Sequence, residues 1–374
     1  MLKIAILGAN GFIGSRAVEV FHLASLAEVH PVVRTTHSLA RLSRFNLECH
    51  VANAFDQQAL QTAFEGCEIV VHAIAGDNKT IVESLAPTYN AAQAAGVRRM
   101  VYLSTASVHG QSPQAGTDEN SVLNDRQEIA YNNSKVHAEW QLKKLRQNGS
   151  VEIVLLRPGI VFGPRSFWIT NFVSDLLNGK AYIVNGGQGI CNSIYVDNLI
   201  HAIYKACDAK DADGEAFIVG DEETITWADF YLPFAEALGK NLSDVHQVIY
   251  QPASKTSKER VKDFLESPMG RTIVSAVPSK LFKATKASVS ILLSKPENRS
   301  SWTLPKLHQH PIDKPSASLE MALLHQCPYK LPDVKARKML GYQPPVTFNE
   351  ACRRTVGWLS FAGYPILRYA KELK

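Results

Sequence analysis

Over the first 165 residues, short apolar runs alternate with segments whose apolar positions recur at helical spacing. The apolar runs predict strands at Lys3–Leu7, Val29–Val33, Ile69–Ile74, Arg99–Ser104 and Val151–Leu156. Between them the pattern predicts helices, which end near Ala24, Phe64, Ala95 and Leu145. Nearly continuous apolar strands separated by helices indicate a parallel sheet covered on both faces, a doubly wound α/β fold.

A glycine motif follows the first predicted strand and opens the first predicted helix. Gly8, Gly11 and Gly14 suit a tight turn, a close approach of backbone to a diphosphate, and close packing of helix on sheet, in that order. The diphosphate of a dinucleotide would then sit at the positive end of the helix, beside Asn10, Phe12 and Ile13. The alternative is a plain glycine turn between a strand and a helix.

The patterning changes after residue 165, where elements shorten and Gly and Pro become more frequent. We therefore expect a dinucleotide-binding Rossmann-type domain over 1–165 and, over 166–374, mostly a smaller substrate-binding lobe. The lobe is expected to be interleaved with the sheet around 180–220. A Ser-, Lys- and Pro-rich insertion at 252–315 fits the alternation poorly.

Arg34 stands at the end of the second predicted strand, twenty residues after Gly14. An acidic residue there would bind the adenosine ribose hydroxyls of NAD, whereas an arginine offers donors to the 2′-phosphate of NADP. The position favours NADP(H) and leaves NAD(H) open. The alternative is that Arg34 is a solvated charge at a strand end.

Tyr131 and Lys135 lie one helical turn apart on a predicted helix. A tyrosine hydroxyl is a poor acid or base at neutral pH, because its ordinary pKa is about 10. A neighbouring ammonium favours the phenolate and can also hold a nicotinamide ribose. Ser104, Thr105 and Ser107 lie at the end of the predicted strand Arg99–Ser104, at the sheet edge where open α/β sheets bind ligands.

Composition is that of an ordinary soluble globular protein, with 45% hydrophobic and 20% charged residues. No signal peptide or long apolar span is recognisable, and the six cysteines are scattered, so we expect free thiols and a cytoplasmic location. The histidines show no metal-ligand spacing, and a net charge of +5 is too small to indicate nucleic acid.

The basic excess is concentrated in residues 251–310, with eleven Lys/Arg against four Asp/Glu. Residues 278–295 predict an amphipathic helix with lysines on its polar face. Three readings stay open: packing on the lobe, peripheral contact with an anionic membrane, and a lid over the active site.

Several motifs in one order carry a family resemblance beyond the glycine loop. They are Glu65–Ala73, Ala95–Thr105, Val108–Gly110, Tyr131-x-x-x-Lys135-x-x-x-Glu139, Arg157–Pro164 and Ile194–Asn198. The chain resembles the extended short-chain dehydrogenase/reductase superfamily. That group contains NAD-dependent epimerase/dehydratases and 3β-hydroxysteroid-dehydrogenase-like enzymes.

The resemblance implies roles for individual residues. Thr105 occupies the catalytic Ser/Thr position, with Ser104 and Ser107 as near alternatives. Tyr131 is the general acid/base, and Lys135 lowers the pKa of Tyr131. Further residues are implied beside the cofactor: Asn53, Ala73, Ile74, Ala75, Ser104, Lys135, Pro158, Gly159 and Ile160. A homodimer through the helices around 90–100 and 135–147 is also implied.

Three positions depart from the family pattern: Asn53 replaces an Asp, His109 a Tyr, and Cys191 an Arg that contacts the diphosphate of nucleotide sugars. The last departure favours a less charged substrate. We therefore expect an NAD(P)-dependent oxidoreductase acting on a secondary alcohol or ketone of steroid-, terpenoid- or other small-molecule type.

Two alternative functions remain. One is an NAD-dependent nucleotide-sugar epimerase or dehydratase, in which Arg165 or Lys180 replaces the missing diphosphate contact. The other is a non-catalytic cofactor-sensing or scaffold protein. The set of Thr105, Tyr131 and Lys135 argues against it, because a chain without catalysis needs none of them.

Overall fold

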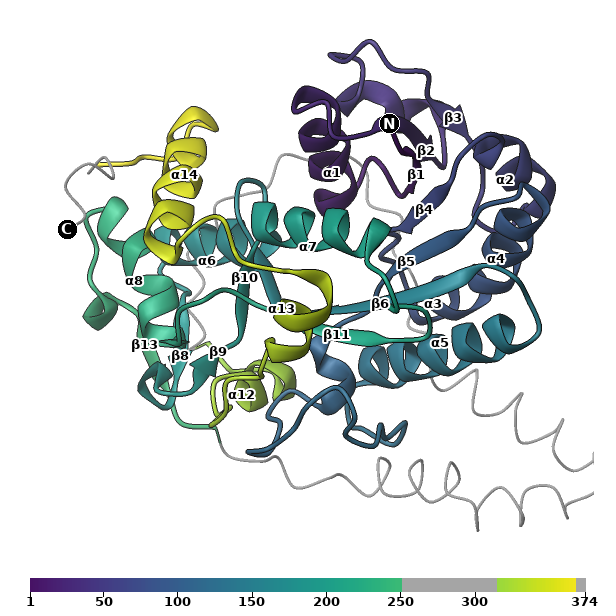
Figure 1. Ribbon diagram of the computed structural model, residues 1–374. Helices are drawn as coiled ribbons and strands as arrows, with labels where there is room; N and C mark the ends of the chain where they lie inside the picture. The colour runs from purple at the N-terminus through teal and green to yellow at the C-terminus, as the bar shows by residue number, and fades with distance from the viewer. Residues whose placement is uncertain (251–314, 368–374) are drawn as a thin grey trace, which may run out of the picture. The chain divides into compact units, whose positions relative to one another are not determined.

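The computed structural model describes residues 1–250 and 315–367. Its centre is a seven-stranded sheet in the order β11-β6-β5-β4-β1-β2-β3, and all neighbouring strands are parallel (Figure 1). The strands are β1 (Lys3–Leu7), β2 (Glu28–Val33), β3 (His50–Val51), β4 (Ile69–His72), β5 (Arg99–Leu103), β6 (Glu152–Pro158) and β11 (Ala216–Val219). The strand order reverses between β1 and β4, which creates the crevice where such sheets bind ligands.

Helices cover both faces of this sheet because successive strand residues point to opposite sides. On one face Ile4 and Ile6 pack with α1 (Phe12–Leu23), α7 (Val196–Asp208) and α13 (Val334–Leu340). On the other face Ala5 and Leu7 pack with α2 (Gln57–Phe64), α3 (Asn78–Glu83), α4 (Leu85–Ala94) and α5 (Ala130–Gln147). The predicted fold class is confirmed.

The second core belongs to a smaller lobe of short strands and helices. It contains β7 (Ile160–Phe162), β8 (Tyr182–Val184), β9 (Ile190–Cys191), β10 (Ser193–Tyr195), β12 (Ile225–Thr226) and β13 (His246–Val248). The helices are α6 (Phe167–Leu177), α8 (Trp227–Ala237), α12 (Leu319–Leu324) and α14 (Phe348–Phe361). Aromatic side chains dominate this core, with Trp227 and Phe230 fully buried.

The chain crosses between the sheet and the lobe more than once. After β6 it enters the lobe at β7, returns to the sheet through α7 and β11, and enters the lobe again at α8. The predicted helix at 278–295, like almost all of the basic insertion 252–315, lies outside the described residues. Among the helices that are described, none combines the length and apolar character needed to cross a membrane.

Candidate active site

The glycine loop joins β1 to α1 at the point where the strand order reverses. Gly8 has φ +90°, and a Cβ there would lie 2.8 Å from the carbonyl oxygen of Ala73, just past β4. A Cβ on Gly14 would lie 2.2 Å from the carbonyl oxygen of Gly8, so only glycine lets the first turn of α1 pack against the loop. Gly11 is the exposed N-cap residue of α1, which leaves the helix N-terminus open to a ligand.

A cavity of about 620 Å³ extends from this loop to the lobe. It gathers twelve of the predicted site residues, which come from five separate parts of the chain: Phe12, Ile13, Ala73, Ile74, Ala75, Ser104, Thr105, Tyr131, Lys135, Pro158, Gly159 and Ile160. Cofactor-side and catalytic residues therefore share one space. This is the arrangement that hydride transfer from a bound dinucleotide to a substrate requires.

Lys135 is buried on α5, with its ammonium turned toward β5. Its Nζ donates to the carbonyl oxygen of Leu103 at 2.8 Å and to the Tyr102 hydroxyl at 3.2 Å. Burial lowers the pKa of Lys135 to about 8, so the side chain is poised to change charge just above neutrality.

Tyr131 stands at the start of α5 and is 37% exposed. Burial and the negative charge of Glu320 raise the pKa of Tyr131 to about 12. The predicted lowering of this pKa by Lys135 stays a prediction. The ammonium of Lys135 donates to Leu103 and Tyr102.

The two hydroxyls after β5 have different surroundings. Ser104 donates from Oγ to the Glu139 carboxylate at 2.5 Å, so its hydroxyl is already engaged in the interior. Thr105 accepts from the Ser107 backbone N–H at 3.2 Å, and its hydroxyl hydrogen has no acceptor among the described residues. Of the two, Thr105 is the better placed to donate to a substrate oxygen.

A buried ion pair supports this edge of the sheet. Arg157 on β6 donates to both carboxylate oxygens of Glu139 on α5, at 2.9 and 2.6 Å. Both side chains are almost fully buried, and Arg157 also contacts Nε2 of His109 at 3.1 Å. Burial and the Arg157 charge lower the pKa of His109 to about 4, so His109 is neutral near pH 7.

His72 is the buried last residue of β4. Its ring packs on Tyr102 with centroids 5.2 Å apart, and neither ring nitrogen has a hydrogen-bond partner among the described residues. Burial and the charge of Lys135 lower the pKa of His72 to about 3. The His72 ring is therefore neutral near pH 7.

Other predicted cofactor residues lie outside the lining of this cavity. Gly8, Gly11 and Gly14 shape the loop, and Asn10 supplies a carbonyl oxygen that accepts from Arg41 at 2.9 Å. Arg34 is exposed directly after β2. Asn53 is exposed as well, and its side-chain oxygen accepts from the backbone N–H of Phe55 at 3.2 Å.

The sequence did not identify the lobe wall of the cavity. Phe167, Trp168 and Leu324 bring apolar surface, while Glu320 on α12 brings a carboxylate that accepts from Gln111 Nε2 at 2.8 Å. Burial raises the pKa of Glu320. No sequence signal links Glu320 to Tyr131, because 189 residues separate them.

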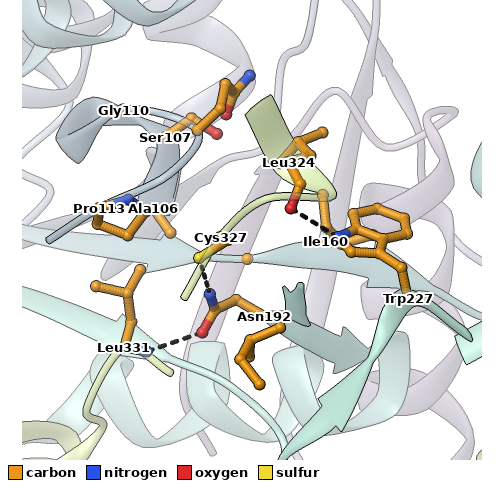
Figure 2. A pocket seen from close by; sticks show the side chains of 13 residues that line it. Ala106, Ser107, Gly110, Pro113, Ile160, Asn192, Trp227, Leu324, Cys327 and Leu331 are labelled. Carbon is orange, nitrogen blue, oxygen red and sulfur yellow. Dashed lines mark hydrogen bonds between the residues drawn. The ribbon is translucent and has the colours of Figure 1, made fainter. Parts of the chain in front are cut away.

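A second, small cavity of about 30 Å³ lies behind Gly159 and Ile160 (Figure 2). Asn192 connects two of the residues that line this cavity. Its side-chain amide donates to Cys327 Sγ at 3.5 Å, and its side-chain oxygen accepts from the Leu331 N–H at 2.8 Å. A Cβ on Gly159 would lie 1.9 Å from the Asn192 carbonyl oxygen. Gly159 is thus required by the close approach of its backbone to the segment between β9 and β10.

A third cavity, of about 230 Å³, adjoins the main one through Phe167, Trp168 and Glu320. Its lining residues are aromatic, apolar, amide or acidic, and none is Lys or Arg. Cys191 is buried in the lobe core and lines none of these cavities. The third cavity therefore offers a substrate apolar, aromatic and acidic surface, with no cation among its described lining residues.

Comparison with known proteins places this site in a family. The sequence model of the NAD dependent epimerase/dehydratase family matches residues 4–220, more than half of the chain, and the chain belongs to that family. The predicted resemblance is confirmed, and the protein is an enzyme of the extended short-chain dehydrogenase/reductase type.

Its relatives include enzymes of two kinds. A UDP-glucose 4-epimerase from Vibrio cholerae is 29% identical over 256 residues, 64% of this chain and 76% of that protein. A 3beta-hydroxysteroid-dehydrogenase/decarboxylase (isoform 3) from Arabidopsis thaliana is 26% identical over 269 residues, 63% of this chain and 46% of that protein. The chain thus spans less than half the length of the plant relative.

Solved structures share the fold. The UDP-glucose 4-epimerase of Thermotoga maritima with UDP-glucose has a TM-score of 0.67 at 17% identity, covering 96% of this chain and 99% of that one. The UDP-glucuronic acid 4-epimerase of Bacillus cereus in complex with UDP-glucuronic acid and NAD has a TM-score of 0.67 at 16% identity, covering 96% and 100%. At these identities the likeness concerns the fold alone.

Proposed function

We propose that this enzyme transfers a hydride between a nicotinamide dinucleotide, preferably NADP(H), and a secondary alcohol or ketone with an apolar body. The observation that carries the proposal is the single cavity containing Ile13, Thr105, Tyr131 and Lys135 beside an apolar lobe wall. The dinucleotide supplies the hydride chemistry, and the chain supplies binding, orientation and proton transfer.

The residues divide this work by position. The glycine loop and the N-terminus of α1 fit the diphosphate of the dinucleotide. Any side chain at Gly8 or Gly14 would clash with neighbouring backbone, so the loop stays tight and its backbone stays accessible. Thr105 donates a hydrogen bond to the substrate oxygen, and Tyr131 exchanges the proton with it. Lys135, charged at neutral pH, holds the nicotinamide ribose and stabilises the phenolate form of Tyr131 once the two are bridged by that ribose.

The preference for NADP(H) rests on Arg34. The side chain is exposed directly after β2, where the adenosine ribose of a bound dinucleotide lies in this fold. An Arg34→Ser variant should bind NADPH more weakly while keeping its affinity for NADH. Equal losses for both cofactors would contradict a 2′-phosphate contact.

Native mass spectrometry of the purified protein, followed by denaturation, tests the class of reaction. We expect the cofactor to exchange freely with solution, and we expect added NADPH to stabilise the protein against unfolding more than NADH does. At a ligand concentration of a hundred times Kd, the stabilisation should reach about 2.7 kcal/mol. A Tyr131→Phe variant should keep this binding and lose turnover.

The second candidate is a nucleotide-sugar epimerase or dehydratase, which the Vibrio cholerae relative favours. The position of Arg165, which lines the catalytic cavity, also favours it. In that reaction the cofactor is reduced and reoxidised within one turnover. Stoichiometric NAD(H) that does not exchange would select this candidate and reduce Arg34 to a surface charge.

A further inference from the structure

Arginines are concentrated around the first turns of α1, where the glycine loop meets the lobe. A cavity of about 430 Å³ there is lined by four of them, and a fifth lines the adjoining catalytic cavity: Arg16, Arg44, Arg165, Arg354 and Arg41. Arg165 lines both cavities. So many cations in one region require negative partners.

Three of these arginines have carboxylate partners. The pairs are Arg16 with Asp197 at 2.6 Å and Glu19 at 2.7 Å, Arg44 with Glu19 at 2.9 Å, and Arg354 with Glu350 at 2.8 Å and Asp197 at 3.3 Å. Arg41 and Arg165 have no carboxylate within ion-pair distance in residues 1–250 and 315–367. Among residues 1–250 and 315–367, Arg41 and Arg165 are therefore two cations without an ion-pair partner, and both line the catalytic cavity.

The two unpaired arginines flank the N-terminus of α1. Arg41, at the end of the 3₁₀ turn Thr36–Arg41, donates from Nη1 to the Asn10 carbonyl oxygen at 2.9 Å. Arg165 donates from Nη2 to Ser15 Oγ at 3.2 Å. Each contact uses one of the five N–H donors of a guanidinium, which leaves donors for a ligand between them.

Arg165 is held in an unfavourable state. Its backbone has φ +73°, a left-handed conformation that is costly for a bulky side chain. Its side chain is half-buried, and burial together with the positive charge of Arg41 lowers the pKa of Arg165. Strained and desolvated residues of this kind concentrate at ligand-binding sites, where the ligand compensates the cost.

We propose that Arg41 and Arg165 bind a diphosphate group from the two sides of the α1 N-terminus. Guanidinium forks match phosphate oxygens in geometry and charge, and the first N–H groups of α1 add donors at the same helix end. The contact with Ser15 favours the diphosphate of the dinucleotide as the source, and the diphosphate of a nucleotide substrate is the other source. This inference rests on the proposed function, because it assigns further ligand contacts to the same site.

Isothermal titration calorimetry on the full chain tests the inference with three probes: NAD⁺, ADP-ribose, and UDP added to NAD⁺-saturated protein. Arg165→Asn suits the test because asparagine tolerates the left-handed backbone. Arg165→Asn and Arg41→Gln should each weaken ADP-ribose binding about tenfold or more, the value of a charge-assisted hydrogen bond. Arg44→Gln, which removes a carboxylate-paired arginine of the same region, should change it less than about twofold.

Unfolding without ligand separates binding from structure. If Arg165 acts on a ligand, Arg165→Asn should melt no lower than the wild type, because the variant removes strain and an unpaired charge. A large fall in its melting temperature would overturn the proposal in favour of a purely structural arginine.

The remaining outcomes are distinct. A loss confined to UDP assigns the two arginines to a substrate diphosphate, whereas unchanged affinity for all three probes overturns the inference and leaves the proposed function standing. Wild-type protein that binds no dinucleotide contradicts the proposed function. In that case, inorganic pyrophosphate that binds to the wild type and not to Arg165→Asn would still support the diphosphate site. If the wild type fails to bind pyrophosphate as well, both the diphosphate site and the proposed function are overturned.

Discussion

At the scale of the residue, Lys135 combines a functional position with an energetic cost. Burial lowers its pKa from 10.5 to about 8, so at pH 7 the folded chain holds a charge that it has partly desolvated. Lys135→Met should therefore raise the free energy of unfolding at pH 7 by about 2 kcal/mol, after allowing for the lost hydrogen bond to Leu103. The same variant should lose activity.

The pH dependence gives this prediction a sign. Between pH 8 and 10.5 the unfolded chain binds the proton more tightly than the folded chain, so wild-type stability rises relative to Lys135→Met. The gap between the two proteins should close over that window in urea unfolding. Lys143→Met, on the exposed face of α5, is the control. Parallel pH curves for the wild type and Lys135→Met would contradict the argument.

The sequence led to Tyr131 and Lys135 because a spacing of four on one helix is visible in the chain itself. It could not show that the ammonium donates to Tyr102 and Leu103, or that Glu320 faces Tyr131. Those contacts join elements far apart in sequence. The direction of the Tyr131 pKa depends on such contacts, and a spacing of four residues does not reveal them.

At the scale of the element, the buried ion pair of Glu139 and Arg157 joins α5 to β6. Removing one partner leaves a buried charge without compensation, so Arg157→Met should cost about 3 to 5 kcal/mol in urea unfolding. The double variant Glu139→Leu/Arg157→Met should recover much of that loss, since both charges are gone.

The exposed pair of Arg353 with Glu350 is the comparison for this prediction. Arg353→Met should leave the midpoint of urea unfolding close to that of the wild type, because solvent screens the pair. A double variant at Glu139 and Arg157 that is no more stable than Arg157→Met would show that the lost volume, and not the unpaired charge, dominates.

Element prediction succeeded where the periodic run was long enough. The first strand was placed at Lys3–Leu7, as observed, and β2, β4, β5 and β6 were found within a few residues at either end. Two-residue strands such as His50–Val51 and Ile225–Thr226 carry no periodicity and were missed. Their existence depends on partners supplied by the tertiary fold.

At the scale of the whole molecule, Asp221 joins the sheet to the lobe. It directly follows Gly220 at the end of β11, and its carboxylate accepts from the Tyr195 N–H at 2.9 Å and from the Asn198 amide at 2.7 Å. Asn198 in turn donates to the Val346 carbonyl oxygen at 2.8 Å, ahead of α14. One buried carboxyl group thus connects three segments that are distant in sequence.

This position makes global stability depend on pH. Burial raises the pKa of Asp221 from 3.8 to about 6, so between these values the folded chain binds a proton that the unfolded chain releases. Stability contributed by Asp221 is fully present below pH 3.8 and is lost as the pH rises through about 6. Relative to Asp221→Asn, the wild type should lose about 3 kcal/mol over this window in urea unfolding. Asp208→Asn, at the exposed end of α7, is the control and should show the same pH dependence of unfolding free energy as the wild type. If the difference in unfolding free energy between the wild type and Asp221→Asn stays constant with pH, Asp221 does not titrate in this window.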